Sequence, residues 1–291
     1  AKTQEDKERS TRYSIVFNGE NYNYQDIRLD LEKLGYAFST TSDTEVLLLS
    51  YIAWGESMLD RLRGMFAFAI WDAETQELFC ARDFFGIKPF YYTQTDDGHF
   101  VFASEAKSIL AHPSYTKELN HRALEDYLVF QFPANEETFF KGIYKLAPAT
   151  FIRVKEGKVI QKKQYWKPQF EPVEGRSLEE LAKEIDDEFR VSVRYHNVAD
   201  VEVGSFLSSG IDSSYMAACL AKENEGIKTF TVGFAEYEGE RDEISWAQEL
   251  AKELKVENHS HHITKDEYWD ALKKIQYYMD ELGAVTGRKY K

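Results

Sequence analysis

A short segment rich in serine and glycine, F-L-S-S-G-I-D-S-S at Phe206 to Ser214, constrains the fold of this chain more than any other feature. The apolar and β-branched residues Val201 to Leu207 predict a buried strand leading into it. Ser214 to Lys222 predicts a helix, with apolar residues at helical spacing at Met216, Cys219 and Leu220. A turn of small residues before a helix N-terminus exposes backbone N–H groups and partial positive charge. The segment therefore predicts a phosphate or pyrophosphate site.

Asp212 narrows the kind of phosphate site. No lysine follows Gly210 as in a P-loop, and the chain has no G-x-G-x-x-G motif of a dinucleotide fold. A carboxylate beside phosphate is repelled unless Mg²⁺ lies between them, so Asp212 favours an ATP site with a bridging magnesium ion. The simpler alternative is that Asp212 or Ser213 only caps the helix.

Composition excludes several classes of partner. The 291 residues, 43% of them hydrophobic, can bury a sizeable core, and this length favours two domains. A net charge of −14 and a pI near 5.1 argue against nucleic-acid and membrane-surface partners. No apolar run approaches the ~20 residues of a membrane span. The polar start, Ala1 to Ser10, does not resemble a signal peptide, so we expect a cytoplasmic protein.

Cysteine and histidine usage gives no metal or disulfide framework. Cys80 and Cys219 lack the paired spacing of either, and we expect both to be buried and inert. His259, His261 and His262 cluster in sequence, but strand alternation separates His262 from the other two. We interpret all three as ordinary strand residues.

The first half predicts an α+β domain. Short strands are expected at Tyr13 to Phe17, Met65 to Trp71, Leu78 to Asp83, Phe90 to Thr95 and Phe100 to Ala103. Two connections predict hairpins, at residues 72–76 and 96–98. Helical periodicity at Ile27, Leu31 and Leu34, and again at Val46, Leu47, Leu49 and Tyr51, predicts helices that pack on an antiparallel sheet.

The second half predicts a parallel α/β domain. Pro168, Pro172 and Gly175 lie in the polar segment Trp166 to Ser177, where we expect a domain boundary. Helices and strands alternate beyond it: helix Leu178 to Val193, the phosphate loop with its flanking elements, strand Thr229 to Phe234, helix Glu243 to Leu254 and strand Val256 to Ile263. This order predicts a doubly wound parallel sheet with the loop at the carboxyl end of a strand.

Two sets of motifs, one in each half, resemble those of glutamine-dependent asparagine synthetases. In the second half, Ser208 to Ser213 resembles the family pyrophosphate loop S-G-G-x-D-S, with Ser209 in place of the first glycine. Val232 matches the position that frames the adenine, and Asp242-Glu243 resembles an acidic pair that opens the next helix. The resemblance implies ATP and Mg²⁺ as cofactors, with Asp212 on the metal. The predicted ATP and pyrophosphate site comprises Leu207, Ser208, Ser209, Gly210, Ile211, Asp212, Ser213, Ser214 and Val232.

In the first half, residues 18–24 resemble the N-G-E-x-Y-N-Y motif of class II glutamine amidotransferases. The Asn18 side chain and the Gly19 backbone N–H suit an oxyanion hole for amide hydrolysis. The matching family acids imply that Glu20 and Asp43 hold the α-ammonium group of glutamine. Taken singly, Asn18-Gly19 is more typical of a hairpin turn and Asp43 of a helix N-cap.

Two further strings resemble family motifs to which we assign structural roles. They are R-D-F-F-G-I-K-P-F-Y-Y at residues 82–92 and F-A-S-E-A-K at residues 102–107. Phe84 replaces a family proline, and the aromatics Phe85, Tyr91 and Tyr92 are expected in the core. The resemblance places an Ntn-hydrolase-like amidotransferase domain at residues 1–166 and a partial, doubly wound ATP-pyrophosphatase domain at residues 176–291.

Three departures from the family pattern limit the expected activity. The chain begins Ala1-Lys2-Thr3, whereas the family nucleophile is an N-terminal cysteine, so we expect no glutaminase activity from this polypeptide alone. Met279-Asp280-Glu281 starts a family segment that Leu282 to Lys291 does not continue, and the later S-G-E-G-A-D-E loop has no counterpart. A fragment and a natural truncation both fit these observations.

The function predicted for the parent enzyme is ATP-dependent amidation of aspartate through β-aspartyl-AMP, with ammonia from glutamine. Its substrates would be glutamine, aspartate and ATP, and a homodimer is one option for the assembly. Two alternatives stay open: another amidotransferase-ligase, such as a β-lactam synthetase-like enzyme, and an inactive ligand-binding module.

Overall fold

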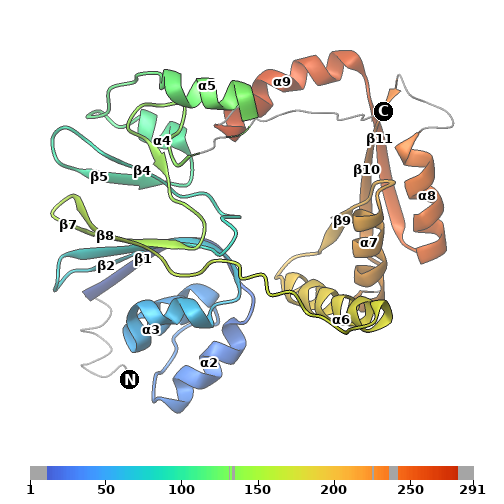
Figure 1. The fold of residues 1–291 in the computed structure, drawn as a ribbon, viewed down its shortest axis with the longest axis horizontal. Coiled ribbons are helices and arrows are strands. Elements are labelled where there is room, and N and C mark those ends of the chain that lie inside the picture. The colour runs from blue at the N-terminus through green and yellow to red at the C-terminus, as the bar shows by residue number, and fades with distance from the viewer. Residues whose placement is uncertain (1–11, 131, 133–134, 225, 236–241, 281–291) are drawn as a thin grey trace. The chain divides into compact units, whose positions relative to one another are not determined.

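The structure is a computed structural model that describes residues 12–130, 132, 135–224, 226–235 and 242–280 (Figure 1). The predictions for Ala1 to Ser10, Glu281 and Leu282 to Lys291 lie outside these residues. The chain divides into two compact units, the first ending at Gln169 and the second spanning Phe170–Tyr277, with Tyr278, Met279 and Asp280 grouped with the first.

Two antiparallel sheets form the first unit. The larger has the strand order β1-β2-β3-β7-β8, and the smaller has the order β5-β4-β6. The strands are β1 (Tyr13–Asn21), β2 (Gly64–Asp72), β3 (Glu77–Arg82), β4 (Tyr91–Gln94), β5 (Phe100–Ala103), β6 (Tyr144–Lys145), β7 (Thr150–Lys155) and β8 (Lys158–Gln164). Both predicted hairpins are confirmed, because β2 pairs with β3 and β4 with β5 in antiparallel register.

Five helical segments accompany these sheets: α2 (Tyr24–Lys33), α3 (Asp43–Trp54), the 3₁₀ helix η1 (Gly55–Arg61), α4 (Ala106–Leu110) and α5 (His121–Phe130). Helices α2 and α3 cover one face of the larger sheet, and the smaller sheet lies on its other face (Figure 1). The first unit is therefore layered as helices, sheet and sheet, which confirms the predicted α+β class with antiparallel sheets.

The side chains of β2 explain this layering. Phe66, Phe68 and Ile70 join Leu31 and Leu47 in the core beneath the helices. The alternate residues Ala67 and Ala69 face the opposite way and pack with Cys80, Phe90, Tyr92 and Ile152 between the sheets. A strand with large side chains on one face and alanines on the other fits between a helical layer and a closely packed second sheet.

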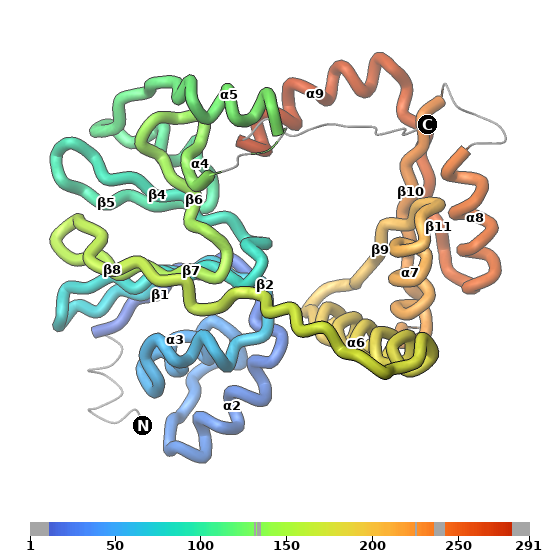
Figure 2. Tube along the Cα trace, viewed as in Figure 1, coloured from blue at the N-terminus to red at the C-terminus, as the bar shows by residue number. Residues whose placement is uncertain are grey.

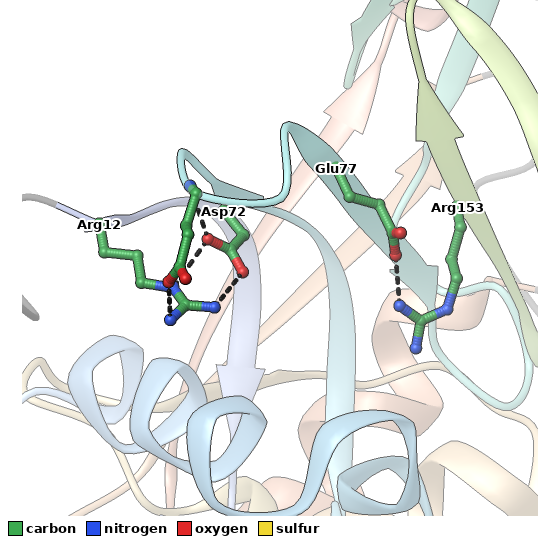
Figure 3. A network of polar contacts seen from close by, with 5 residues as sticks. Arg12, Asp72, Glu77 and Arg153 are labelled. Carbon is green, nitrogen blue, oxygen red and sulfur yellow. Dashed lines mark hydrogen bonds and ion pairs between the residues drawn. The ribbon is translucent and has the colours of Figure 1, made fainter.

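Ion pairs connect neighbouring strands of the larger sheet (Figure 3). The Arg12 guanidinium donates to both carboxylate oxygens of Asp72 at 2.8 and 2.7 Å and also pairs with Glu74. These hydrogen bonds lower the pKa of Asp72 to about 2. Arg153 on β7 pairs with Glu77 on β3 through a single nitrogen and also with Glu56. The contacts join the residue before β1 to the end of β2, and the first residue of β3 to the middle of β7.

The second unit contains a three-stranded parallel sheet, ordered β11-β10-β9, with alternating helices (Figure 2). Its elements are α6 (Leu178–His196), β9 (Gly204–Phe206), α7 (Ile211–Glu223), β10 (Lys228–Phe234), α8 (Glu243–Leu254), β11 (Glu257–Ile263) and α9 (Lys265–Met279), the last of which runs past the unit boundary. Leu207, Ala217, Ala247 and Ala251 pack together, while Val193, Cys219, Leu220 and Ile227 form a second cluster. The expected parallel order of strands is present.

Two expectations around the phosphate loop were wrong. The strand predicted as buried over Val201 to Leu207 is limited to β9, and Phe206 is 80% exposed because β9 is the edge strand of this sheet. The helix begins at Ile211 rather than Ser214, because Gly210 adopts an extended N-cap conformation with φ −77° and ψ 147°. Asp212 and Ser213 therefore lie in the first helical turn, where an acidic side chain is favoured by the helix dipole.

Both cysteines are buried, as expected. Tyr91 and Tyr92 are also buried, but Phe85 is 72% exposed, so its expected core position was wrong. The buried Asp83 carboxylate holds the turn by accepting from the Phe85 backbone N–H, so the Phe85 ring is not needed in the core. Among the aromatic residues described, this ring contacts only Trp166, in an edge-to-face arrangement. In the part of the chain that the structure describes, no helix is both long and apolar enough to cross a bilayer.

Candidate active site

Asn18, Gly19 and Glu20 lie within β1 and are not in a turn. They pair with Ala67, Phe66 and Met65 of β2 in unbroken antiparallel register. The hairpin-turn alternative for Asn18-Gly19 was therefore wrong. Alternation along β1 places Asn18 and Glu20 on one face of the strand and Gly19 on the other.

Gly19 cannot be replaced without strain, whatever its role with a ligand. Its φ of +150° lies in a region that L-residues rarely adopt. A Cβ atom at this position would lie 2.1 Å from the Met65 carbonyl oxygen. Glycine here lets β1 and β2 approach closely, so the backbone of the predicted oxyanion segment is held against the core of the first unit.

The Asn18 side chain faces the smaller sheet. Its Nδ2 donates to Ser104 Oγ at 3.1 Å, and Ser104 follows directly after β5. Both residues line a cavity of about 230 Å³ between β1, β2 and β5, whose other walls are Val16, Phe17, Ala67, Phe68, Ala69, Phe90, Phe102 and Ala103. The amide thus lies at the rim of a mostly apolar recess large enough for part of a small substrate.

Asp43 is the first residue of α3, and its carboxylate lies beside the end of β1. The helix N-cap is Ser42, whose Oγ accepts from the Thr44 backbone N–H at 3.2 Å, so the N-cap alternative for Asp43 was wrong. Asp43 Oδ2 instead accepts from the backbone N–H of Asn21 at 3.1 Å. The fold therefore brings Asp43 next to the residue that follows Glu20, although 22 positions separate Asp43 from Asn21.

Sequence reasoning did not single out Asn21. Its side chain is 2% exposed, and neither Nδ2 nor Oδ1 has a hydrogen-bond partner in the part of the chain that the structure describes. Buried amides are normally hydrogen-bonded. The Asn21 amide is therefore an unsatisfied polar group at the end of β1, next to Glu20 of the predicted glutamine site. The variable position of the seven-residue motif gave no signal for it.

The turn after β3, part of the motif at residues 82–92 that we expect to be structural, is bonded to β2 beside the candidate site. Asp83 is 1% exposed, and its carboxylate accepts from the backbone N–H groups of Phe66, Phe85, Ile87 and Lys88 at 2.9 to 3.2 Å. The neighbouring Arg82 guanidinium donates to the carbonyl oxygens of Gly86, Lys88 and Leu146. Phe84, in place of the family proline, packs its ring against Phe66, Tyr165 and Trp166.

In the second unit, the predicted phosphate loop is a turn of four residues, Leu207 to Gly210, whose conformation is held by hydrogen bonds of serine hydroxyls. Ser208 Oγ lies 2.8 Å from Ser213 Oγ and accepts from the Gly210 backbone N–H at 3.2 Å. Ser214 Oγ donates to the Gly210 carbonyl at 2.8 Å. These bonds hold the loop against the start of α7, whose first backbone N–H groups have no intrahelical acceptor.

Asp212 and Val232 lie at the same end of the sheet. The Leu207 backbone N–H donates to the Phe230 carbonyl, and Thr231 Oγ1 donates to the Leu207 carbonyl at 2.8 Å, so the loop is tied to β10 beside Val232. Val232 is 45% exposed. Asp212 is also exposed, and its carboxylate makes no hydrogen bond or ion pair within the described residues. The capping alternative was wrong, because neither Asp212 nor Ser213 is the N-cap.

Asp242 is structural. As N-cap of α8, it accepts from the Ile244 backbone N–H at 3.1 Å and lies 3.3 Å from His262 Nε2. Burial alone would raise the pKa of Asp242, but these hydrogen bonds and one from Ser245 outweigh burial and lower it. His259 and His261 pair with Glu257 and Glu267, and within the described residues no group of three ligands could hold a metal ion. All three histidines lie in β11, as expected of strand residues.

Comparison with known proteins shows to which family the chain belongs. Residues 3–166 match the glutamine amidotransferase domain. The chain belongs to the glutamine amidotransferase family. Residues 184–289 match asparagine synthase, so the predicted resemblance to glutamine-hydrolysing asparagine synthetases is confirmed for both halves.

Curated relatives of the chain are longer proteins. The chain is 42% identical over 269 residues to asparagine synthetase (glutamine-hydrolyzing) 1 of Bacillus subtilis, and the aligned region covers 92% of this chain and 42% of that protein. It is 35% identical over 275 residues to asparagine synthetase (glutamine-hydrolyzing) 3 of the same organism, covering 89% and 44%. Amidase chyE of Penicillium rubens is 34% identical over 261 residues, covering 84% and 38%. The chain thus spans less than half the length of these relatives.

Among solved structures, the chain is similar to the glutamine phosphoribosylpyrophosphate amidotransferase of B. subtilis. That match has a TM-score of 0.40 at 14% sequence identity and covers 96% of this chain and 73% of the other.

Proposed function

We propose that the chain carries the glutamine site and the ATP site of a glutamine-dependent asparagine synthetase. One observation carries the proposal: motifs for both half-reactions occur in a single chain, each on its own compact unit. The residue ranges proposed for the two domains are 1–166 and 176–291. An Ntn-hydrolase-like first domain and a larger, doubly wound second sheet belong to the same proposal.

In the first unit, Asn18 Nδ2 and the Gly19 backbone N–H would stabilise the oxyanion that develops when glutamine is hydrolysed. Such donors must be fixed before the charge appears, and a strand locked to β2 provides that rigidity. Glu20 and Asp43 would bind the α-ammonium group of glutamine. Asp43 Oδ2 accepts from the Asn21 N–H at 3.1 Å and Oδ1 accepts from the Thr44 hydroxyl at 3.3 Å, so the carboxylate is already held in place for this contact.

In the second unit, ATP would bind with its phosphates at Leu207 to Ser214 and its adenine beside Val232. The β-carboxylate of aspartate attacks the α-phosphorus of ATP, which forms β-aspartyl-AMP and releases pyrophosphate. Ammonia then attacks the acyl carbon, and AMP leaves with the bonding electron pair as asparagine forms. The first turn of α7 supplies backbone donors for pyrophosphate.

The residues present fit a magnesium ion that arrives with the nucleotide. Mg²⁺ is usually held by one or two carboxylates together with phosphate oxygens and water. Asp212 provides one exposed carboxylate without a protein partner in the described structure, at the start of the helix that faces the loop. Bound there, Mg²⁺ would neutralise phosphate charge. A cytoplasmic location and a homodimeric assembly stay predictions.

Isotope transfer tests the proposal. The full gene product is supplied with glutamine labelled with ¹⁵N at the side-chain amide, with aspartate and with Mg-ATP. We expect ¹⁵N in the β-amide of asparagine and one AMP for each asparagine formed. Asn18→Ala should lower labelling from glutamine by about 10²–10³-fold while leaving synthesis from free ammonia intact. Formation of ADP instead of AMP, or of a labelled amide on another acceptor, would contradict the proposal.

A further inference from the structure

Ser104 is the polar neighbour of the predicted oxyanion donor. Its Oγ accepts from Asn18 Nδ2 at 3.1 Å, although 86 positions separate the two residues in the chain. No other hydrogen bond to the Asn18 side chain occurs among the described residues. The cavity beside it is walled by apolar groups such as Phe90, Phe102 and Ala103, which offer no alternative partner through their side chains.

A side-chain amide needs such a partner to present its N–H group reliably. Rotation about the last bond of asparagine exchanges the amide oxygen and nitrogen, and only the nitrogen donates. An oxyanion is stabilised by the nitrogen and repelled by the oxygen. Because Nδ2 carries two hydrogens, one can bind Ser104 while the other remains directed elsewhere. Ser104, which directly follows β5, accepts from Nδ2 in this structure and so holds the amide with its second N–H available for an oxyanion.

Ser104 is exposed, and its backbone is placed by the elements on either side of it. Ser104 joins β5 to α4, and the core beneath it contains Ala106, Ile109 and Tyr91, all at most 3% exposed. The sequence shows Ser104 in the string F-A-S-E-A-K, to which we assigned only a structural role. The fold brings this string to the strand that carries Asn18.

We propose that Ser104 is a positioning residue for glutamine hydrolysis, which it serves by holding the Asn18 amide with Nδ2 toward the developing oxyanion. This inference rests on the proposed function of the first unit. In this proposal the α-amino group of glutamine is bound by Glu20 and Asp43 and not by Ser104. Removing its hydroxyl should therefore change turnover and leave substrate affinity nearly unchanged.

The test compares three variants of the full gene product in an assay of ammonia release from glutamine. A single hydrogen bond of ordinary strength corresponds to a kcat loss of about threefold to tenfold in Ser104→Ala, with KM within about twofold. Ser104→Thr keeps the hydroxyl and should recover most of kcat. Ser108→Ala removes an exposed hydroxyl four residues away that does not contact Asn18, and it should behave as wild type.

A double-mutant cycle separates positioning from general structure. Asn18→Ala combined with Ser104→Ala should cost no more than Asn18→Ala alone, because Ser104 acts only through Asn18. The NMR signals of the Asn18 side-chain amide should shift in Ser104→Ala and stay unchanged in Ser108→Ala. Additive losses, or full kcat in Ser104→Ala, overturn the positioning role alone. Absence of ammonia release from the wild type would instead refute the proposed function, and the positioning role with it.

Discussion

Replacing Gly19 with alanine tests how the candidate oxyanion segment is built. The substitution places a Cβ atom 2.1 Å from the Met65 carbonyl oxygen, far inside van der Waals contact. It also forces a residue with a side chain to adopt a φ of +150°. Neither problem can be relieved by a side-chain rotation, because the clash is with the backbone of β2.

The two effects can be estimated separately. A non-glycine residue in a sparsely populated backbone region costs about 1–3 kcal/mol. Overpacking against a rigid neighbour adds about 1–3 kcal/mol. Gly19→Ala should therefore lower the free energy of unfolding of the first unit by about 2–6 kcal/mol. Gly35 is the matched control, since its φ is +89° but an added Cβ would meet nothing within 4 Å. Gly35→Ala should cost about 1–2 kcal/mol, from backbone strain alone.

Urea unfolding read by hydrogen exchange of peptides from β1 and β2 measures this difference in the first unit alone. We expect the order of stability wild type, Gly35→Ala, Gly19→Ala, with the largest loss of protection in β1 and β2. Equal unfolding midpoints for the two variants would refute the steric argument. They would show that β1 and β2 do not hold Gly19 as closely as the structure indicates.

Three other residues give sharper tests of separate parts of the account. Asp83→Ala leaves four backbone N–H groups without their acceptor. It should lower the free energy of unfolding of the first unit, measured in urea, by at least about 3 kcal/mol. Asp83→Asn keeps one acceptor oxygen and should cost less. The pKa of Asp72 is about 2 in the folded protein, against an ordinary value of 3.8. Its contribution to stability is therefore present above pH 4 and is lost as the pH falls toward 2. Asp72→Asn should flatten the dependence of unfolding free energy on pH over this range, and an unchanged dependence would contradict the pairing with Arg12. Asp212→Ala and Asp212→Asn should each weaken Mg-ATP binding about tenfold or more in calorimetry without changing thermal stability, and equal affinities in all three proteins would leave Asp212 as an ordinary surface residue.

Periodicity predicted most of the fold because most of it depends on local patterns. The alternation of large and small side chains in β2 and the spacing of apolar residues in α3 and α8 are visible in sequence. Errors arose where tertiary context decides. β9 is short because it lies at an edge of the described sheet, and Phe85 is exposed because Asp83 fixes the turn around it from inside.

The candidate sites show the same division. Motifs identified Asn18, Gly19 and Asp43 as residues of one site, yet only the fold shows that Asp43 contacts the backbone of β1 through Asn21. Two features could not be predicted: the Asn21 amide without a partner among the described residues, and the contact between Ser104 and Asn18. Both depend on how β1 lies against elements distant in sequence, and a single chain carries no signal of that packing.

The most direct test of the account is a hydrogen-exchange comparison of the protein with Mg-ATP and with glutamine. The two ligands would bind different units, so Mg-ATP should protect Leu207 to Ser214 and the β10 peptide that contains Val232. Glutamine should protect Asn18 to Asn21 and the start of α3 at Asp43. Protection of the Asn18 segment by Mg-ATP, without protection of residues 207–214, would contradict the assignment of the two sites.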